Sequence, residues 1–195
     1  PLLHPDTCVH NDIDIDDFSC IVTGSNMSGK STWLRAIGIN LVLAYAGSPV
    51  CARKFRCSVM DIYTSMEIRD DLLEGVSTFY AELKRINMIL ENSRRGKPMI
   101  YLIDEIFRGT NSLDRITGAK VVLQLLSENG AIGLISTHDF ELCDLDKEAW
   151  SNFRNYHFEE QYVGGRIEFD YKLRPGRCTT SNARYLMKMV GIDIS

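Results

Sequence analysis

Apolar residues along this chain follow two patterns. Three short continuous runs, at residues 18–23, 99–103 and 131–136, lack polar alternation, which is typical of strands covered on both faces in a parallel sheet. Elsewhere apolar residues recur at spacings of three and four, which predicts amphipathic helices. The expected inward faces are Leu34, Ile37, Leu41 and Tyr45, then Phe79, Leu83, Ile86 and Leu90 (helix 78–92), then Ile116, Ala119, Leu123 and Leu126. Alternating strands and helices predict a doubly wound α/β fold.

The last part of the chain follows a different pattern. Residues 156–162, then Gly164-Gly165, then apolar residues at every second position of 167–173 predict an antiparallel hairpin with one polar face. A short helix is expected at 182–190. We therefore predict an α/β fold with a largely parallel sheet flanked by helices and a C-terminal antiparallel hairpin. With 195 residues, one domain spanning 1–195 is expected. The start at Pro1, without Met, predicts a piece of a longer chain.

A glycine-rich loop follows the first predicted strand, with the pattern Gly24-x4-Gly29-Lys30-Ser31. It opens a predicted helix, so backbone N–H groups and the helix N-terminus favour an anion there. We expect Lys30 to reach the β- and γ-phosphates of a nucleotide, and Ser31 to bind Mg²⁺. The alternative is a glycine-rich turn beside a surface lysine. The predicted nucleotide contacts are Gly24, Ser25, Asn26, Met27, Ser28, Gly29, Lys30, Ser31 and Thr32.

Two acidic residues, Asp104 and Glu105, end the second buried run. A carboxylate at the end of a parallel strand beside a phosphate loop can hold Mg²⁺, so Asp104 is the predicted metal ligand together with Ser31. Glu105 is expected to orient or deprotonate the water that attacks the γ-phosphate. Acidic residues at an exposed strand end are common, so by themselves they are a weak signal. Paired with the loop, they indicate a nucleotide hydrolase, with Lys30 and Glu105 as catalytic residues.

Composition restricts the partners. The net charge of −4 argues against direct DNA binding by this segment, because non-specific affinity for DNA needs a basic surface. No apolar run approaches the roughly 20 residues that cross a bilayer, so no contact with a membrane is expected. The six cysteines contain no C-x-x-C pair and do not cluster with the four histidines. We expect reduced thiols in a cytoplasmic protein, without a structural metal.

Together these motifs resemble the C-terminal ATPase domain of MutS-type DNA mismatch repair proteins, a branch of the ABC class of P-loop NTPases. Asn26-Met27 is the distinguishing dipeptide of the loop. The other matching segments are Asp104-Glu105-Ile106-x-Arg108-Gly109-Thr110 with Asp114, which resembles the Walker B element and the loop after it, Ser136-Thr137-His138, and Arg174-Pro175-Gly176. The resemblance implies ATP and Mg²⁺ as cofactors. It also implies that His138 senses or polarises the γ-phosphate.

The segment Ser77-Thr78-Phe79-x-x-Glu82 resembles the part of the family that faces the partner subunit's nucleotide. The resemblance implies that Ser77 contacts the γ-phosphate held by the other protomer, in a homodimer formed through the ATP sites. DNA would be bound by parts of the parent protein outside this chain. Without the resemblance, Ser77 is equally well interpreted as an ordinary helix N-cap.

Several positions depart from the family pattern. Cys8 stands where an aromatic residue often contacts adenine, and His10 is the possible substitute. Ser25 and Ser28 replace a proline and a glycine of the loop, which removes no backbone N–H group. The leading hypothesis is an ATPase that powers a MutS-like mismatch repair protein, from a divergent branch. The alternatives are a MutS-like ATPase acting on recombination or other DNA structures, and a nucleotide-gated dimerisation module with negligible hydrolysis.

Overall fold

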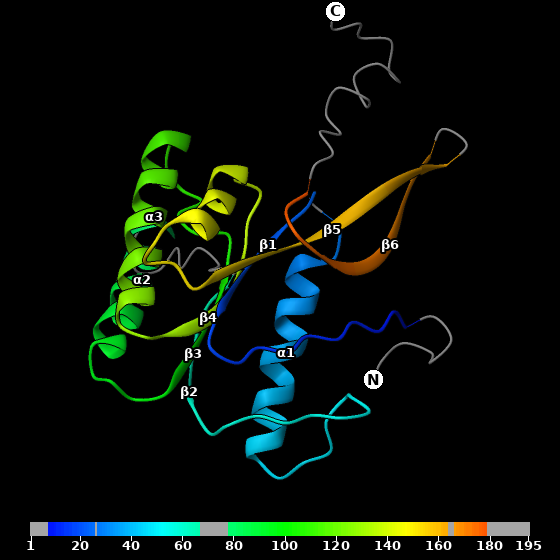
Figure 1. The fold of residues 1–195 in the computed structure, drawn as a ribbon, viewed down its shortest axis with the longest axis horizontal. Helices are drawn as coiled ribbons and strands as arrows, with labels where there is room; N and C mark the ends of the chain where they lie inside the picture. Colours follow the sequence, from blue (N-terminus) through cyan, green and yellow to red (C-terminus); the bar gives the residue numbers. More distant parts are fainter. Residues whose placement is uncertain (1–7, 26, 67–77, 164–165, 179–195) are drawn as a thin grey trace, which may run out of the picture.

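The computed structural model describes residues 8–25, 27–66, 78–163 and 166–178. These residues form one six-stranded sheet in the order β2-β3-β4-β1-β5-β6, with helices on both faces (Figure 1). The elements are β1 (Ser19–Thr23), α1 (Lys30–Tyr45), β2 (Asp61–Ser65), α2 (Thr78–Ser93), β3 (Met99–Asp104), α3 (Ser112–Glu128), β4 (Ile132–Ser136), the 3₁₀ helix η2 (Phe140–Lys147), β5 (Phe153–Val163) and β6 (Arg166–Pro175).

Every neighbouring pair of strands is parallel except β5 and β6, which are antiparallel. The predicted α/β class, the largely parallel sheet and the C-terminal hairpin are therefore confirmed. The hairpin is continuous with the main sheet, because β5 also pairs with β1 from Ser19↔Phe153 to Thr23↔His157. The strand that precedes the glycine-rich loop is thus held between β4 and the hairpin.

Two apolar layers hold the helices against the sheet. Alternate residues of β1 divide between them: Cys20 and Val22 face α1, whereas Ile21 faces α2 and α3. Figure 1 shows α1 on one side of the sheet and α2 and α3 on the other. Since β1 and β3 are buried along their whole length, their continuous apolar runs reflect burial on both faces.

The inward face of α2 was predicted incorrectly at one position. Leu83 is 38% exposed, whereas Glu82 and Ile89 are buried. The buried face of α2 is rotated relative to the predicted one. The reason is that the Glu82 carboxylate turns inward to accept a hydrogen bond from the backbone N–H of Phe107. Spacing alone cannot reveal such an acceptor.

Two elements were not predicted. The edge strand β2 mixes polar and apolar residues and is only partly buried, so it has no continuous apolar run. The 3₁₀ helix η2 buries Leu142, Cys143 and Leu145 between acidic residues. The predicted helix at 182–190 lies outside the described residues.

The described residues hold neither a membrane-spanning helix nor a cluster of metal ligands. None of the helices there is long and apolar enough to cross a membrane. All six cysteines are free thiols. The same ranges hold no group of three or more His, Cys, Asp or Glu side chains able to bind a metal ion by themselves.

A buried tyrosine joins the three central strands. The Tyr101 hydroxyl donates to Ser19 Oγ at 2.9 Å, and Gly133 N donates to the same oxygen at 3.0 Å. Tyr101 and Gly133 are register partners on β3 and β4. A Cβ at position 133 would lie 2.3 Å from Tyr101 Cδ2. Glycine is therefore required here to make room for the ring.

We expect Gly133→Ala to lower the free energy of unfolding by about 1–3 kcal/mol, since the Tyr101 ring and the paired strands must shift. Urea denaturation measures this loss. In a Tyr101→Leu background the same substitution should cost less, because the ring that it meets is gone. An equal cost in both backgrounds would show that the contact is not the cause.

Candidate functional site

The site lies at the carboxyl ends of β1, β3 and β4. These strands are parallel neighbours, and their ends are aligned, since Ser136 is the register partner of both Val22 and Asp104. The glycine-rich loop after β1, the acids that end β3 and the turn after β4 therefore meet at one edge of the sheet. Side chains at this edge of an open α/β sheet commonly bind ligands.

Two glycines shape the backbone of the glycine-rich loop. Gly24 has a φ of 143°, and a Cβ there would lie 2.7 Å from the carbonyl oxygen of Phe158. Gly29 caps α1 with a φ of 103°. Both positions require glycine. The loop is also attached to β5, because the Ser25 hydroxyl donates to the buried Glu160 carboxylate.

Lys30 begins α1 and folds back across the loop. Its Nζ donates to the carbonyl oxygens of Gly24 at 2.7 Å and Ser25 at 2.8 Å. Burial lowers the pKa of Lys30, and the nearby carboxylates of Glu105 and Asp104 oppose that shift. The loop thus holds a buried cation beside two acidic residues.

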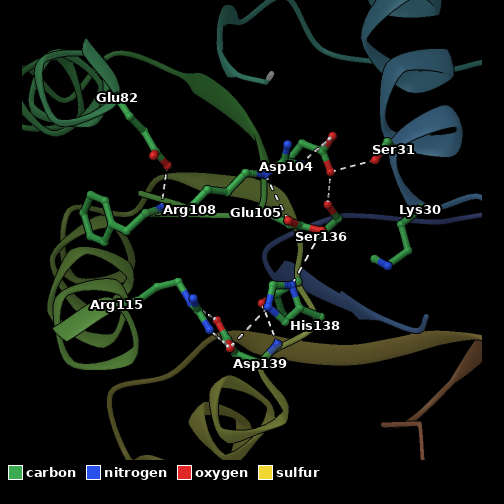
Figure 2. A network of polar contacts seen from close by, with 12 residues as sticks. Lys30, Ser31, Glu82, Asp104, Glu105, Arg108, Arg115, Ser136, His138 and Asp139 are labelled. Carbon is green, nitrogen blue, oxygen red and sulfur yellow. Dashed lines mark hydrogen bonds and ion pairs between the residues drawn. The ribbon is translucent and has the colours of Figure 1, made fainter. Parts of the chain in front are cut away.

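Asp104 is the centre of a hydrogen-bond network (Figure 2). Its Oδ1 accepts from Ser31 Oγ at 2.9 Å and also from Ser136 Oγ. Arg108 Nη2 lies 3.6 Å from its Oδ2. Asp104 is only 4% exposed, so these partners offset the cost of burying its charge. The side chains of Ser31 and Asp104 offer oxygen atoms of the kind that Mg²⁺ prefers.

Glu105 has a left-handed backbone, with a φ of 56°. Its N–H donates to the Ser136 carbonyl at 2.9 Å, which extends the β3–β4 pairing by one residue. One carboxylate oxygen lies 2.9 Å from Arg108 Nε, and the other lies 3.6 Å from His138 Nδ1. Strained backbone of this kind, at a cost of about 1–3 kcal/mol, is concentrated at functional sites.

His138 follows β4 and lies between two carboxylates. Its Nε2 is 3.8 Å from Asp139 Oδ1, on the side opposite Glu105. Asp139 is in turn held by Arg115, whose Nε and Nη2 donate to Oδ2 and Oδ1 at 2.8 and 2.7 Å. Hydrogen bonding to Asp139 raises the pKa of Arg115.

Comparison with known proteins identifies the family. Residues 20–193 match the family described as MutS domain V. The chain belongs to the MutS family. It is 34% identical to the DNA mismatch repair protein MutS of Roseiflexus sp. (strain RS-1), over 97% of this chain and 18% of that protein. It is 34% identical to DNA mismatch repair protein MutS of Aquifex pyrophilus, over 91% of this chain and 21% of that protein.

A third relative is the DNA mismatch repair protein MutS 2 of Haloarcula marismortui, 35% identical over 93% of this chain and 19% of that protein. The chain therefore spans about a fifth of the length of these MutS relatives. The predicted membership of the MutS family is confirmed. The ATPase activity and the roles assigned to individual residues stay predictions.

The structure brings five of the predicted MutS site residues together: Lys30, Ser31, Asp104, Glu105 and His138. Ser28 of the loop is buried, whereas Met27 is 82% exposed and Thr32 is exposed on α1. Asn26 and Ser77 lie outside the described residues. The N-terminal segment runs along β6, where Lys172 Nζ donates to the His10 carbonyl at 2.9 Å, and Cys8 is exposed.

Sequence reasoning missed three side chains that lie beside this group of residues. Arg115 and Asp139 lie 24 positions apart, and no spacing rule pairs them. Tyr171 has a φ of 54°, and its ring lies 3.2 Å from the position of a Cβ on Gly29. It stacks on Phe169 at 5.9 Å between ring centroids and is 45% exposed. Two aromatic residues on one face of the predicted hairpin were the available signal.

Glu82 connects α2 to the loop that follows Asp104-Glu105. Its buried carboxylate accepts hydrogen bonds from the backbone N–H groups of Phe107 and Arg108. Burial is the largest influence and raises the pKa of Glu82, although these N–H groups and the Arg108 charge act in the opposite direction. The folded protein therefore binds this proton more tightly than the unfolded chain does.

It follows that the free energy of unfolding contributed by Glu82 falls as pH rises from the ordinary value of 4.5 through the folded pKa. Glu82→Gln keeps a carbonyl acceptor but does not titrate. We expect the stability of this variant relative to wild type to improve as pH rises from about 4 to about 7, measured by urea denaturation. Glu91→Gln, at an exposed position of α2, is the control. A pH-independent difference for Glu82→Gln would contradict the assignment.

Proposed function

We propose that this chain is a P-loop NTPase domain of the ABC type that binds and hydrolyses ATP with Mg²⁺ within a MutS-like DNA mismatch repair protein. The observation that carries the proposal is the 2.9 Å contact between Ser31 Oγ and Asp104 Oδ1, two residues 73 positions apart in the chain. Membership of the MutS family supports it, as do relatives named as DNA mismatch repair proteins.

The residues of the loop suit a polyphosphate. The backbone N–H groups of residues 24–32 and the start of α1 favour an anion. Lys30 Nζ, now bonded to two loop carbonyls, can exchange them for phosphate oxygens. Ser31 and Asp104 would hold Mg²⁺, which neutralises the charge that develops on phosphate oxygens during transfer.

Glu105 is the proposed general base. It follows the buried Asp104 directly, and its side chain is 18% exposed. Arg108 Nε pairs with one oxygen of its carboxylate at 2.9 Å, and His138 Nδ1 lies 3.6 Å from the other. We propose that Glu105 orients and deprotonates water and that His138 polarises the γ-phosphate.

Tyr171 is the proposed contact for the base of the nucleotide. The sequence has Cys8 where an aromatic residue was expected. The half-exposed Tyr171 ring lies beside Gly29 of the loop and is supported by Phe169. Stacking on an aromatic ring would give the site affinity for a base without hydrogen-bond specificity.

The complete site is proposed to need a second protomer. Ser77 precedes α2, and Glu82 ties that helix to the loop after Glu105. In this proposal, Ser77 contacts the γ-phosphate of the partner in a homodimer, and DNA is bound by other parts of the parent protein. The net charge of −4 and six free thiols agree with a cytoplasmic domain that does not itself grip DNA.

Glu105→Gln tests the proposal. We expect Mg²⁺-dependent binding of a fluorescent ATP analogue to stay within about 3-fold of wild type, while phosphate release falls by roughly 100-fold or more, because the general base is lost. Nucleotide-bound dimers should accumulate, as seen by light scattering. Glu148→Gln, at an exposed position, is the control.

Other outcomes of this experiment are equally informative. Absence of nucleotide binding by folded wild-type protein contradicts the proposed function. Unchanged phosphate release in Glu105→Gln contradicts the role of Glu105. Binding and dimerisation without hydrolysis in wild type would favour a nucleotide-gated dimerisation module.

For Tyr171→Ala we expect ATP affinity to fall about 10-fold, the effect of losing one stacked base. Affinity for tripolyphosphate, which has no base, should not change, as measured by calorimetry. Tyr171→Phe keeps the ring at the same backbone conformation and should bind ATP like wild type. Equal losses of affinity for ATP and for tripolyphosphate would show that Tyr171 supports the phosphate-binding loop and does not contact the base.

A further inference from the structure

A second network lies behind the proposed catalytic residues and has no part in the mechanism above. Arg115 is in the first turn of α3, and Asp139 follows β4. Their side chains form a two-pronged ion pair at 2.8 and 2.7 Å, with side-chain exposures of 16% and 7%. Bidentate pairs of this kind fix geometry as well as charge. Figure 2 shows the pair beside the His138 ring.

The turn that carries His138 is held on both sides. Thr137 N donates to the Val22 carbonyl at 3.0 Å, which joins the turn to the strand before the glycine-rich loop. Asp139 N donates to Thr137 Oγ1 at 3.0 Å. The backbone of His138 is therefore fixed, and the remaining freedom lies in the direction of its imidazole ring.

Arg115 is itself anchored to the loop that follows Glu105. Its N–H donates to the Asn111 carbonyl at 3.0 Å, and Asn111 Oδ1 caps α3 by accepting from Asp114 N at 3.0 Å. The Arg115–Asp139 pair therefore joins the loop after β3 to the turn after β4. These two segments carry Glu105 and His138.

The imidazole has two acidic neighbours that compete for it. His138 Nδ1 lies 3.6 Å from Glu105 Oε1, and Nε2 lies 3.8 Å from Asp139 Oδ1, so neither contact is a hydrogen bond. Arg115 occupies both oxygens of Asp139. Without the guanidinium, a buried carboxylate would be left beside an imidazole that can pair with it, and an unpaired buried charge is costly.

We propose that Arg115 is a positioning residue for His138: by occupying both oxygens of Asp139, it prevents that carboxylate from capturing the imidazole and keeps His138 directed towards Glu105. This inference rests on the proposed function for its catalytic consequence. Its structural content, the direction of the His138 ring, does not depend on any nucleotide.

Arg115→Met tests it, since methionine fills much of the same volume without charge. We expect kcat for ATP hydrolysis to fall roughly 10-fold or more, as expected for a displaced catalytic group, while the Kd for a fluorescent ATP analogue stays within about 3-fold. Arg115→Lys should be intermediate, because an ammonium cannot donate a parallel pair of hydrogen bonds.

The double variant Arg115→Met/Asp139→Asn separates positioning from general stability. An amide cannot form an ion pair with His138, so kcat should recover to within about 3-fold of wild type. Asp139→Asn alone should also keep a near wild-type kcat. Lys147→Met, which removes the exposed ion pair with Asp144 at 2.6 Å, is the matched control and should change nothing. Circular dichroism and urea denaturation establish that each variant is folded.

Imidazole NMR spectra of the nucleotide-free protein give a readout that a purely structural role would not change. The ring nitrogen resonances of His138, identified with His138→Gln, should shift in Arg115→Met and return in the double variant. The inference is overturned if those resonances are the same in wild type and Arg115→Met, or if folded Arg115→Met hydrolyses ATP like wild type. It is also overturned if the double variant fails to recover. Failure of wild type to bind nucleotide would overturn the proposed function alone, because the NMR comparison remains valid.

Discussion

One carboxylate oxygen of Asp104 accepts hydrogen bonds from both Ser31 and Ser136. The first donor comes from the helix after β1 and the second from the end of β4, so this atom joins three segments of the chain. Such convergence is possible because parallel strands place all their carboxyl ends at one edge of the sheet. An antiparallel arrangement of the same strands would send these groups to opposite edges.

The loop after Asp104 stores backbone strain that its surroundings hold in place. Glu105 and Phe107 both have positive φ values, of 56° and 61°. The Glu82 carboxylate accepts from the N–H of Phe107, and the Phe107 ring packs edge-on against Phe79. A close approach of Gly109 to the Phe79 side chain leaves no room for a Cβ at position 109. The N-terminal half of α2 and this loop therefore behave as one unit.

Each acidic side chain in the site has a polar or cationic partner, and Asp104 and Glu105 share Arg108. Asp104 has two hydroxyls and the distant Arg108, Glu105 has Arg108, and Asp139 has Arg115. The glycine-rich loop itself holds the cation Lys30, whose Nζ donates to two loop carbonyls and not to a carboxylate. Because each acid already has a partner, the carboxylates near the loop do not rule out the proposed binding of an anion there.

The sequence by itself determined the elements and the chemistry at their ends. Continuous apolar runs can persist only in strands buried on both faces, and the order of glycine, lysine, serine and paired acids restricts which groups follow those strands. The α/β class and the hairpin could therefore be read from the chain. The mixed edge strand β2 could not, since its burial comes from one neighbouring strand and not from its own pattern.

Tertiary structure alone decided the contacts between residues far apart in the chain. Nothing local requires Glu82 to turn inward, Arg115 to pair with Asp139, or Tyr171 to lie against Gly29. Each of these side chains is polar or aromatic at a position where sequence periodicity allows several orientations. Its direction is set by an acceptor, a charge or a glycine that the fold brings within a few ångströms, and that information is not contained in spacing along the chain.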